Sequence, residues 1–319
     1  MTLHLTDADE GRHLPGTEEL WGESWYHDWA ASDGSYGGYL RLGLYPNQKV
    51  VWYWVALVRE GKPLVLLVDH EVPAPPMPTD PAPDPTVSVA SDTVRATWSP
   101  VEPLWKYNIT TDGTGIALAD PADELRGARK GPEVPISLDL TWQGVAPAFP
   151  YAMTTRFEQS AWVEGTVTFG DERIAVHCPG QRDHSWGVRD WWLFGWQWCS
   201  GRLDDGTWWH TARSIVPTVD IFQTGYLVRP DMSLEPVENV GADYELDDEM
   251  LPMRGELTVG DLEMTWTAEL QAPVLLVSPE GKQSRFPRCT CKFQTADGRE
   301  GRGWLEYNFP EGVPHLKSV

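Results

Sequence analysis

Two adjacent polar residues near the middle of the chain are of types that could do acid–base chemistry. Asp183 and His184 lie in the stretch from Cys178 to Val216, which also holds seven of the protein's 18 tryptophans. A carboxyl group packed against indole rings loses hydration, which raises its pKa and lets it donate a proton near pH 7. Asp183 is therefore the first candidate for a general acid. His184 is the candidate for its partner, or for a base that activates water or removes a proton.

The tryptophans that follow could line a binding site. Residues 191–200 and 208–216 have the pattern of two strands, and Asp205-Gly206 between them favours a two-residue type I′ turn. This register pairs Asp204 with Thr207, Trp198 with Arg213, Trp196 with Ile215 and Arg202 with Trp209. Because side chains alternate along a strand, Trp192, Phe194, Trp196 and Trp198 share one face. The candidate substrate-binding residues here are Trp186, Trp192, Trp196, Trp198 and Trp209.

A second pair of tryptophans lies on another predicted hairpin. Residues 36–45 and 50–58 read as two strands joined by Pro46-Asn47-Gln48-Lys49. Trp52 and Trp54 share one face of the second strand and are further candidates for substrate binding.

Structural interpretations of the same residues remain open. Asp183 follows Arg182 and lies near Arg189, and an ion pair would lower its pKa and prevent proton donation at neutral pH. The tryptophans could equally form an aromatic core. Ser185 completes an Asp-His-Ser run, but consecutive residues of an extended chain point to opposite sides. The sequence also has no Gly-x-Ser-x-Gly elbow, which disfavours a hydrolase triad.

Composition and charge narrow the classes of partner. The chain has 25 Lys+Arg and 47 Asp+Glu, a formal net charge of −22. A field of this sign repels phosphate backbones and anionic lipid, so no nucleic-acid partner is expected. No run approaches the roughly 18 apolar residues of a membrane span. Residues 1–13 lack the basic and apolar regions of a secretory signal, which predicts a cytoplasmic protein.

No metal or other cofactor is expected from the motifs. The four cysteines, Cys178, Cys199, Cys289 and Cys291, lack Cys-x-x-Cys spacing, which favours buried thiols over a zinc site. The sequence has no P-loop, no Gly-x-Gly-x-x-Gly and no His-Glu-x-x-His.

The alternating pattern predicts an all-β fold. Many short strand-like segments are separated by turn residues, and helical periodicity is scarce. Because 319 residues exceed what one simple barrel needs, we expect two antiparallel β domains of barrel or sandwich type. They comprise residues 1–170 and 171–319, with the boundary placed to within about 20 residues. Residues 1–19 read as a poorly ordered polar lead-in.

The central stretch resembles a known family. Gly180-Gln-Arg-Asp183-His184-Ser-Trp186-Gly187, followed by tryptophan-rich strands and an Asp-Gly turn, is similar to the carotenoid 1,2-hydratase (hydroxyneurosporene synthase) and AttH-like superfamily. The resemblance implies two lipocalin-like β domains with an apolar pocket between or within them, and it places Asp183 at the position of the family's motif aspartate. Known activities in the family include water addition to isoprenoid alkenes, and related fungal proteins promote pericyclic cyclisation of polyketide chains.

These observations lead to one predicted function and two alternatives. The prediction is a cofactor-independent, acid-catalysed hydratase, cyclase or isomerase that acts on an apolar, isoprenoid-like substrate in a tryptophan-lined pocket. Indole faces could also stabilise a carbocation there. The first alternative is a lipocalin-like carrier of an apolar ligand with no catalysis. The second, carbohydrate binding on exposed tryptophans, is disfavoured because the aromatic strands read as buried.

Overall fold

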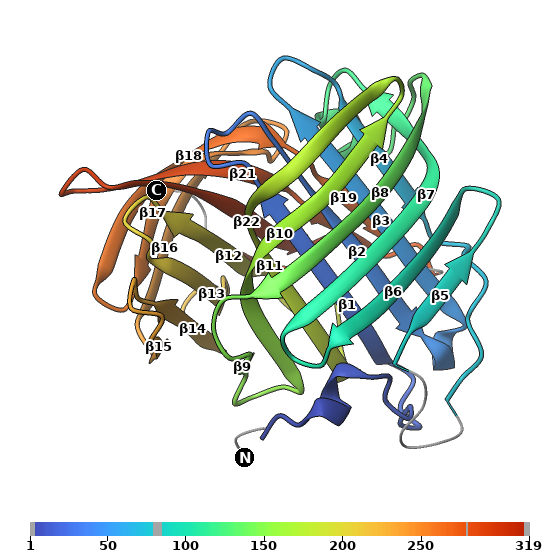
Figure 1. The fold of residues 1–319 in the computed structure, drawn as a ribbon, viewed down its shortest axis with the longest axis horizontal. Helices are drawn as coiled ribbons and strands as arrows, with labels where there is room; N and C mark the ends of the chain where they lie inside the picture. Colours follow the sequence, from blue (N-terminus) through green and yellow to red (C-terminus); the bar gives the residue numbers. More distant parts are fainter. Residues whose placement is uncertain (1–3, 79–84, 279, 316–319) are drawn as a thin grey trace.

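The protein is built almost wholly from antiparallel β-strands. The computed structural model describes residues 4–78, 85–278 and 280–315, and its strands form two large sheets (Figure 1). Alternation of apolar and polar residues produces the strands. In β8 (Glu133–Gly144), for example, Ile136, Leu138, Leu140 and Trp142 are buried while the residues between them are not. The predicted all-β fold is confirmed.

The first sheet holds the N-terminal strands and closes into a ring. Its order is β4-β3-β2-β1-β11-β10-β8-β7-β6-β5, and β9 pairs with β10. A further pairing of β4 with β7 joins the two sides, so that eight strands enclose a core. The strands are β1 (Trp21–Ala30), β2 (Tyr36–Tyr45), β3 (Val50–Arg59), β4 (Leu64–Asp69), β5 (Val87–Ala90), β6 (Val94–Glu102), β7 (Lys106–Leu118), β8, β9 (Phe149–Pro150), β10 (Arg156–Phe169) and β11 (Glu172–Val188).

The second sheet holds the C-terminal strands and curls without closing. Its order is β15-β14-β13-β12-β22-β21-β18-β17-β16, with β20 pairing to β22 and β19. Strands β13 and β14 contact β16 and β17, so the sheet wraps around its own core. The strands are β12 (Trp196–Leu203), β13 (Trp208–Ser214), β14 (Gln223–Val228), β15 (Leu234–Val237), β16 (Val240–Leu246), β17 (Pro252–Val259), β18 (Leu262–Gln271), β19 (Val274–Val277), β20 (Gln283–Phe286), β21 (Arg288–Thr295) and β22 (Glu300–Pro310).

Sheet membership changes between Val188 and Trp196. The division into domains near residue 170 stays a prediction. The helices are short: the 3₁₀ turns η1 (Asp7–Glu10) and η2 (Pro46–Gln48), and α1 (Ala122–Leu125). No helix in the described part of the chain is long and apolar enough to cross a membrane.

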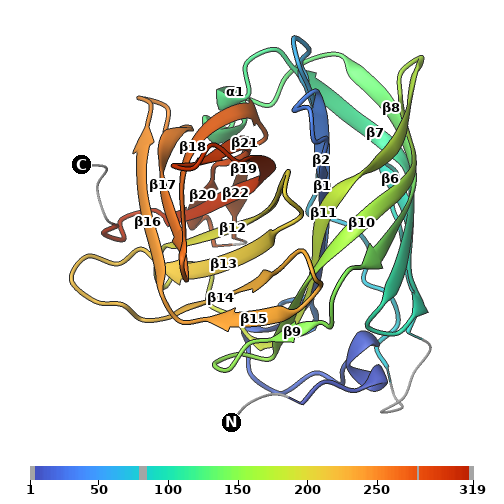
Figure 2. The same cartoon turned by 60° about the vertical axis from the view of Figure 1, so that its left-hand side comes forward.

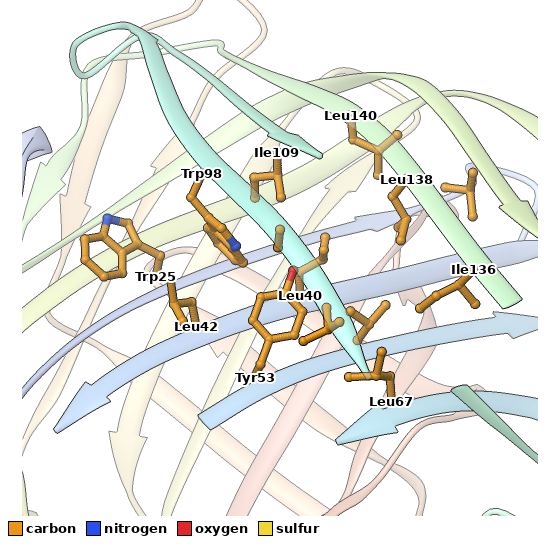
Figure 3. Packing of buried hydrophobic residues seen from close by; sticks show 14 of the residues in the cluster. Trp25, Leu40, Leu42, Tyr53, Leu67, Trp98, Ile109, Ile136, Leu138 and Leu140 are labelled. Atoms are coloured by element: carbon orange, nitrogen blue, oxygen red, sulfur yellow. The ribbon is translucent and has the colours of Figure 1, made fainter. Parts of the chain in front are cut away.

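Among the described residues, the three largest apolar clusters hold the sheets in place. One fills the first ring, where Trp25, Leu42 and Trp98 come together from different strands (Figure 3). Another lies inside the curl of the second sheet and includes Trp209. A third joins the outer face of the first sheet to the second sheet, which faces it (Figure 2). Each sheet is therefore apolar on the face it turns toward the other as well as inside.

The predicted register of the Asp205-Gly206 hairpin is wrong by one residue. Of the two predicted turn residues, Gly206 has a positive φ, of 95°, and Asp205 does not, so a type I′ turn is not formed. Leu203 instead pairs with Thr207 across a three-residue loop in which Gly206 is the left-handed residue of a bulge. Trp196 therefore pairs with Ser214, Trp198 with Ala212 and Arg202 with Trp208. The strand also starts at Trp196, which leaves Trp192 and Phe194 in the preceding loop.

Residues 9–13 are packed against the rest of the protein, so the expected poorly ordered lead-in is wrong there. Glu10 is buried beneath the first sheet and receives hydrogen bonds from Nη1 and Nη2 of Arg182 at 2.8 and 3.0 Å. Arg182 is equally buried. The four cysteines are buried and free of disulfides.

Breaking the Glu10–Arg182 pair should destabilise the protein. Glu10→Gln leaves the Arg182 guanidinium buried without its counter-charge, which costs about 3–5 kcal/mol of unfolding free energy. Denaturant unfolding measures the change. Glu249→Gln removes an exposed ion pair to Arg126 and should leave the unfolding free energy almost unchanged. Equal effects of the two substitutions would contradict a structural role for the buried pair.

Candidate active site between the two sheets

Strand pairing in the first sheet lines up five side chains across its outer face. Trp54 pairs with Arg41, Arg41 with Tyr26, Tyr26 with Asp183, and Asp183 with Glu158. Directly paired residues of antiparallel strands point to the same side of the sheet. Residues up to 157 positions apart in the chain, Tyr26 and Asp183, thus share one row. We call these five the first-sheet row.

A matching row crosses the face of the second sheet. Thr224 pairs with Ala212, Ala212 with Trp198, Trp198 with Glu306, and Glu306 with Arg288. All five line the same cavity as Asp183. We call them the second-sheet row.

Tyr26, Arg41 and Asp183 of the first-sheet row face the second-sheet row across a cavity of about 450 Å³, and the other two members of the first-sheet row lie outside its lining. This volume suits a small organic ligand. Aromatic side chains of Trp191, Phe194, Trp196 and Trp198 form much of its wall. Its mouth is apolar, since Met153, Val188, Leu193 and Ile221 line it and remain exposed to solvent. The pocket therefore lies between the sheets, a placement that the sequence left open.

Asp183 is buried in the wall of this cavity and is electrostatically unusual. Its Oδ2 accepts a hydrogen bond of 2.7 Å from Nη2 of Arg156. Burial raises the pKa of Asp183 to about 7, against the lowering effect of Arg156 and with support from the neighbouring charge of Glu158. The ion pair considered for Arg182 or Arg189 is formed by Arg156 instead. It does not hold the pKa of Asp183 down at the ordinary value of a carboxyl group.

Glu158 shares Arg156 with Asp183 but has the opposite character. Burial acts to raise its pKa, yet Arg156, His210 and several hydrogen bonds outweigh burial and lower it. Its Oε1 accepts from Nε of Arg156 at 2.8 Å and from Nε1 of Trp198 at 3.0 Å. The two carboxyl groups that share Arg156 therefore have pKa values shifted in opposite directions. Such a difference lets one group, Asp183, act as an acid while the other, Glu158, stays ionised.

His184 lies on the other face of β11 and is turned away from the cavity. Its Nδ1 donates to the carbonyl of Asp9 at 3.0 Å, its Nε2 lies 3.1 Å from Oε1 of Glu23, and its ring stacks on Trp25. His13 also contacts Glu23, at 2.8 Å. Ligand atoms of His13, Glu23 and His184 lie within 4.8 Å of one another and could hold a divalent ion. Each already has hydrogen-bond partners, so the cluster needs no metal to explain it.

The seven candidate tryptophans are distributed over four environments. Trp196 and Trp198 line the cavity. Trp52, Trp54 and Trp192 pack in the apolar core behind it. Trp209 belongs to the core of the second sheet, and Trp186 to a small cluster with Trp21 and Phe157. Among the described residues, then, Asp183, Trp196 and Trp198 are the sequence-predicted ones that meet in the cavity wall.

Several charged residues of the site were missed by sequence reasoning. Arg156 and Glu158 come from β10, Arg41 from β2, and Arg288 and Glu306 from β21 and β22. None stands in a recognisable motif. The sequence did offer one indication, a charged residue within an otherwise apolar strand segment, as Arg41 is within Tyr36–Tyr45. Charged residues are rarely buried unless they are paired or functional.

A larger depression of about 960 Å³ lies elsewhere, over β8, β10 and β11. Its lining is polar and largely exposed, and includes Asp139, Glu164 and Arg173. It lacks the buried titratable groups of the cavity between the sheets.

Comparison with known proteins supports the fold and gives the family. The profile of the family described as Domain of unknown function (DUF7064) matches residues 6–311. The chain belongs to this family. No curated protein sequence matches the chain.

Solved structures with the same fold are distant in sequence. A putative AttH from Nitrosomonas europaea is 15% identical with a TM-score of 0.60, covering 93% of this chain and 97% of that one. Kievitone hydratase from Nectria haematococca is 10% identical with a TM-score of 0.57, covering 94% and 96%. CghA with Sch210972 is 12% identical with a TM-score of 0.55, covering 94% of both chains. The predicted AttH-like resemblance is thus confirmed at the level of the fold.

The protonation of Asp183 can be measured directly. Infrared difference spectra should show the band of a protonated carboxyl group that disappears with a midpoint near pH 7 and is absent from Asp183→Asn. Glu158→Gln removes a like charge and should lower this midpoint. Arg156→Met removes a counter-charge and should raise it. A midpoint near pH 4 in the unsubstituted protein would contradict the role of burial.

Proposed function

We propose that this protein is an enzyme that transfers a proton to a carbon–carbon double bond of an apolar, isoprenoid-like small molecule, and thereby hydrates, cyclises or isomerises it. One observation carries the proposal: a carboxyl group with a pKa of about 7 lies in the wall of an aromatic cavity. Near neutral pH such a group is present in both forms, so it can donate a proton and accept one back.

The geometry around Asp183 suits a proton donor. Arg156 holds Oδ2, and among the described residues no hydrogen bond is made to Oδ1. A guanidinium at Oδ2 leaves the acidic proton on Oδ1, the oxygen free to meet a ligand. Glu158, fixed as a carboxylate, positions Arg156 rather than reacting itself.

The proton cycle balances without a further reagent except water. The O–H bond of Asp183 breaks as the π electrons of the double bond form a new C–H bond. Attack by water at the neighbouring carbon completes hydration and returns a proton to the Asp183 carboxylate. Loss of an adjacent proton to the Asp183 carboxylate gives an isomer instead. Attack by another double bond of the substrate gives a cyclic cation, which then loses a proton to Asp183 or is captured by water with release of a proton to Asp183. In each case Asp183 ends protonated.

The cavity and the fold support a small, largely apolar substrate. Apolar area buried against Trp196 and Trp198 contributes about 25 cal/mol per Å². One structure of similar fold is by name a hydratase and another was solved with the compound Sch210972, which is consistent with small-molecule chemistry in this architecture.

Asp183→Asn should abolish turnover and leave ligand binding intact. The amide has the same shape but no acidic proton, so we expect the rate to fall at least about 100-fold. Terpene and polyene candidates are incubated with the protein and the products analysed by mass spectrometry, while tryptophan quenching reports binding. Turnover by the unsubstituted protein should fall as the pH rises through about 7, because Asp183 then loses its proton.

Asp220→Asn is the matched control, since Asp220 is exposed and pairs with Arg213 outside the cavity. It should retain full turnover. Full turnover by Asp183→Asn would remove this carboxyl group from the mechanism. Ligands that bind and are all recovered unchanged would instead favour the carrier.

A further inference from the structure

Two buried arginines at the cavity have N–H groups without partners. Arg41 is 3% exposed, and its Nη2 donates to the hydroxyl of Tyr45 at 2.6 Å while its Nη1 has no partner. Arg288 is also 3% exposed and pairs through Nη2 with Glu306, but its Nε and Nη1 have no partner. Both side chains line the cavity. Buried charged donors are rarely left unsatisfied, so these N–H groups point to a ligand.

Aromatic rings hold the two guanidinium groups in place. The Cζ atoms of Arg41 and Arg288 lie 4.7 and 5.4 Å from the ring centre of Trp54. Arg41 also lies 4.8 Å from Trp191, and Arg288 lies 4.6 Å from Tyr39. Stacking fixes the planes of the guanidinium groups and leaves their N–H edges available. Trp54 therefore supports the two arginines from behind and lies outside the cavity lining.

The charges around the cavity leave an excess of positive charge. The buried cations are Arg41 and Arg288, with Arg156 partly buried beside them, and the buried anions are Glu158 and Glu306. Asp183 is protonated below about pH 7, and the charges of Arg189 and Asp190, which also line the cavity, offset each other. Arg156 is matched to Glu158, and Arg288 to Glu306. Among the described residues no carboxylate forms an ion pair with Arg41. This local excess stands out in a chain with a formal charge of −22.

We propose that Arg41 and Arg288 bind an acidic oxygen of the substrate, of carboxylate or enolate type. The ligand is then an amphiphile, with its apolar body against Trp196 and Trp198 and its anionic head at the guanidinium groups. This rests on the proposed function in one respect, that the cavity between the sheets is the substrate site. It also narrows the double bond that is protonated to one conjugated with the bound oxygen, because an excess of positive charge stabilises negative charge on that oxygen.

The head group and Asp183 fit one proton-transfer step. When the bound oxygen is that of an enolate, its electron pair moves to restore the C=O bond as the C=C electrons take the proton of Asp183. The O–H bond of Asp183 breaks, a C–H bond forms, and Asp183 is left as a carboxylate. The neutral carbonyl oxygen remains on the arginines.

Farnesoic acid and farnesol test the proposal, because they share one apolar body and differ in the head group. At about pH 6 the acid is ionised and Asp183 is protonated. Tryptophan quenching should show the unsubstituted protein binding the acid at least about tenfold more tightly than the alcohol. Arg41→Met and Arg288→Met should each weaken acid binding by about tenfold or more and leave the affinity for farnesol within about twofold.

Controls separate this proposal from that of catalysis. Arg254→Met, at an exposed ion pair with Glu245, should change neither affinity. Asp183→Asn should keep the preference for the acid, so the head-group site stands even where the enzyme proposal fails. Equal affinities for acid and alcohol, or failure of both to bind, would overturn the proposal. The proposal would also be overturned if the two arginine variants lowered the affinities for the acid and for the alcohol equally. The comparison in the unsubstituted protein decides the matter even where a variant does not fold.

Discussion

The site depends on one guanidinium that two buried carboxyl groups share. Arg156 bonds both Glu158 and Asp183, and burial of the two carboxyl groups removes most of the hydration that would otherwise make them alike. In water both groups would ionise near pH 4. Here Glu158 collects additional donors from Trp198 and Gln181 and keeps its charge, while Asp183 has fewer donors and stays protonated up to about pH 7. Burial and an unequal share of hydrogen bonds thus create the acid.

Strand β11 connects this site to the stability of the first ring. Because its side chains alternate, Asp183 faces the cavity while Arg182 and His184 face inward, where they bind Glu10 and Glu23. The N-terminal segment is thereby fastened beneath the same strand that presents the candidate acid. One short run of sequence therefore combines a structural face with a chemical one, which accounts for its dense mixture of charged and aromatic residues.

Charge is distributed in opposite senses over the surface and the cavity. The formal charge of −22 arises from acidic residues that are mostly exposed in the described part of the chain. The cavity wall, by contrast, includes two buried arginines that contact aromatic rings and one partly buried arginine that is bonded to Asp183. A large acidic surface is compatible with a site selective for an anion because buried charges are screened far less than exposed ones.

The sequence alone determined what depends on local periodicity. Alternating residues predicted the β fold, and the same alternation predicted that Asp183 and His184 point to opposite sides. Local rules could not choose between a two-residue and a three-residue loop at Gly206, and this moved every partner in the β12–β13 hairpin by one position. They also could not bring Arg41, Asp183 and Glu158 into one row, or set Arg288 opposite them. Pairing between distant strands is decided by the burial of whole faces, so only the tertiary structure assembled the cavity and its charges.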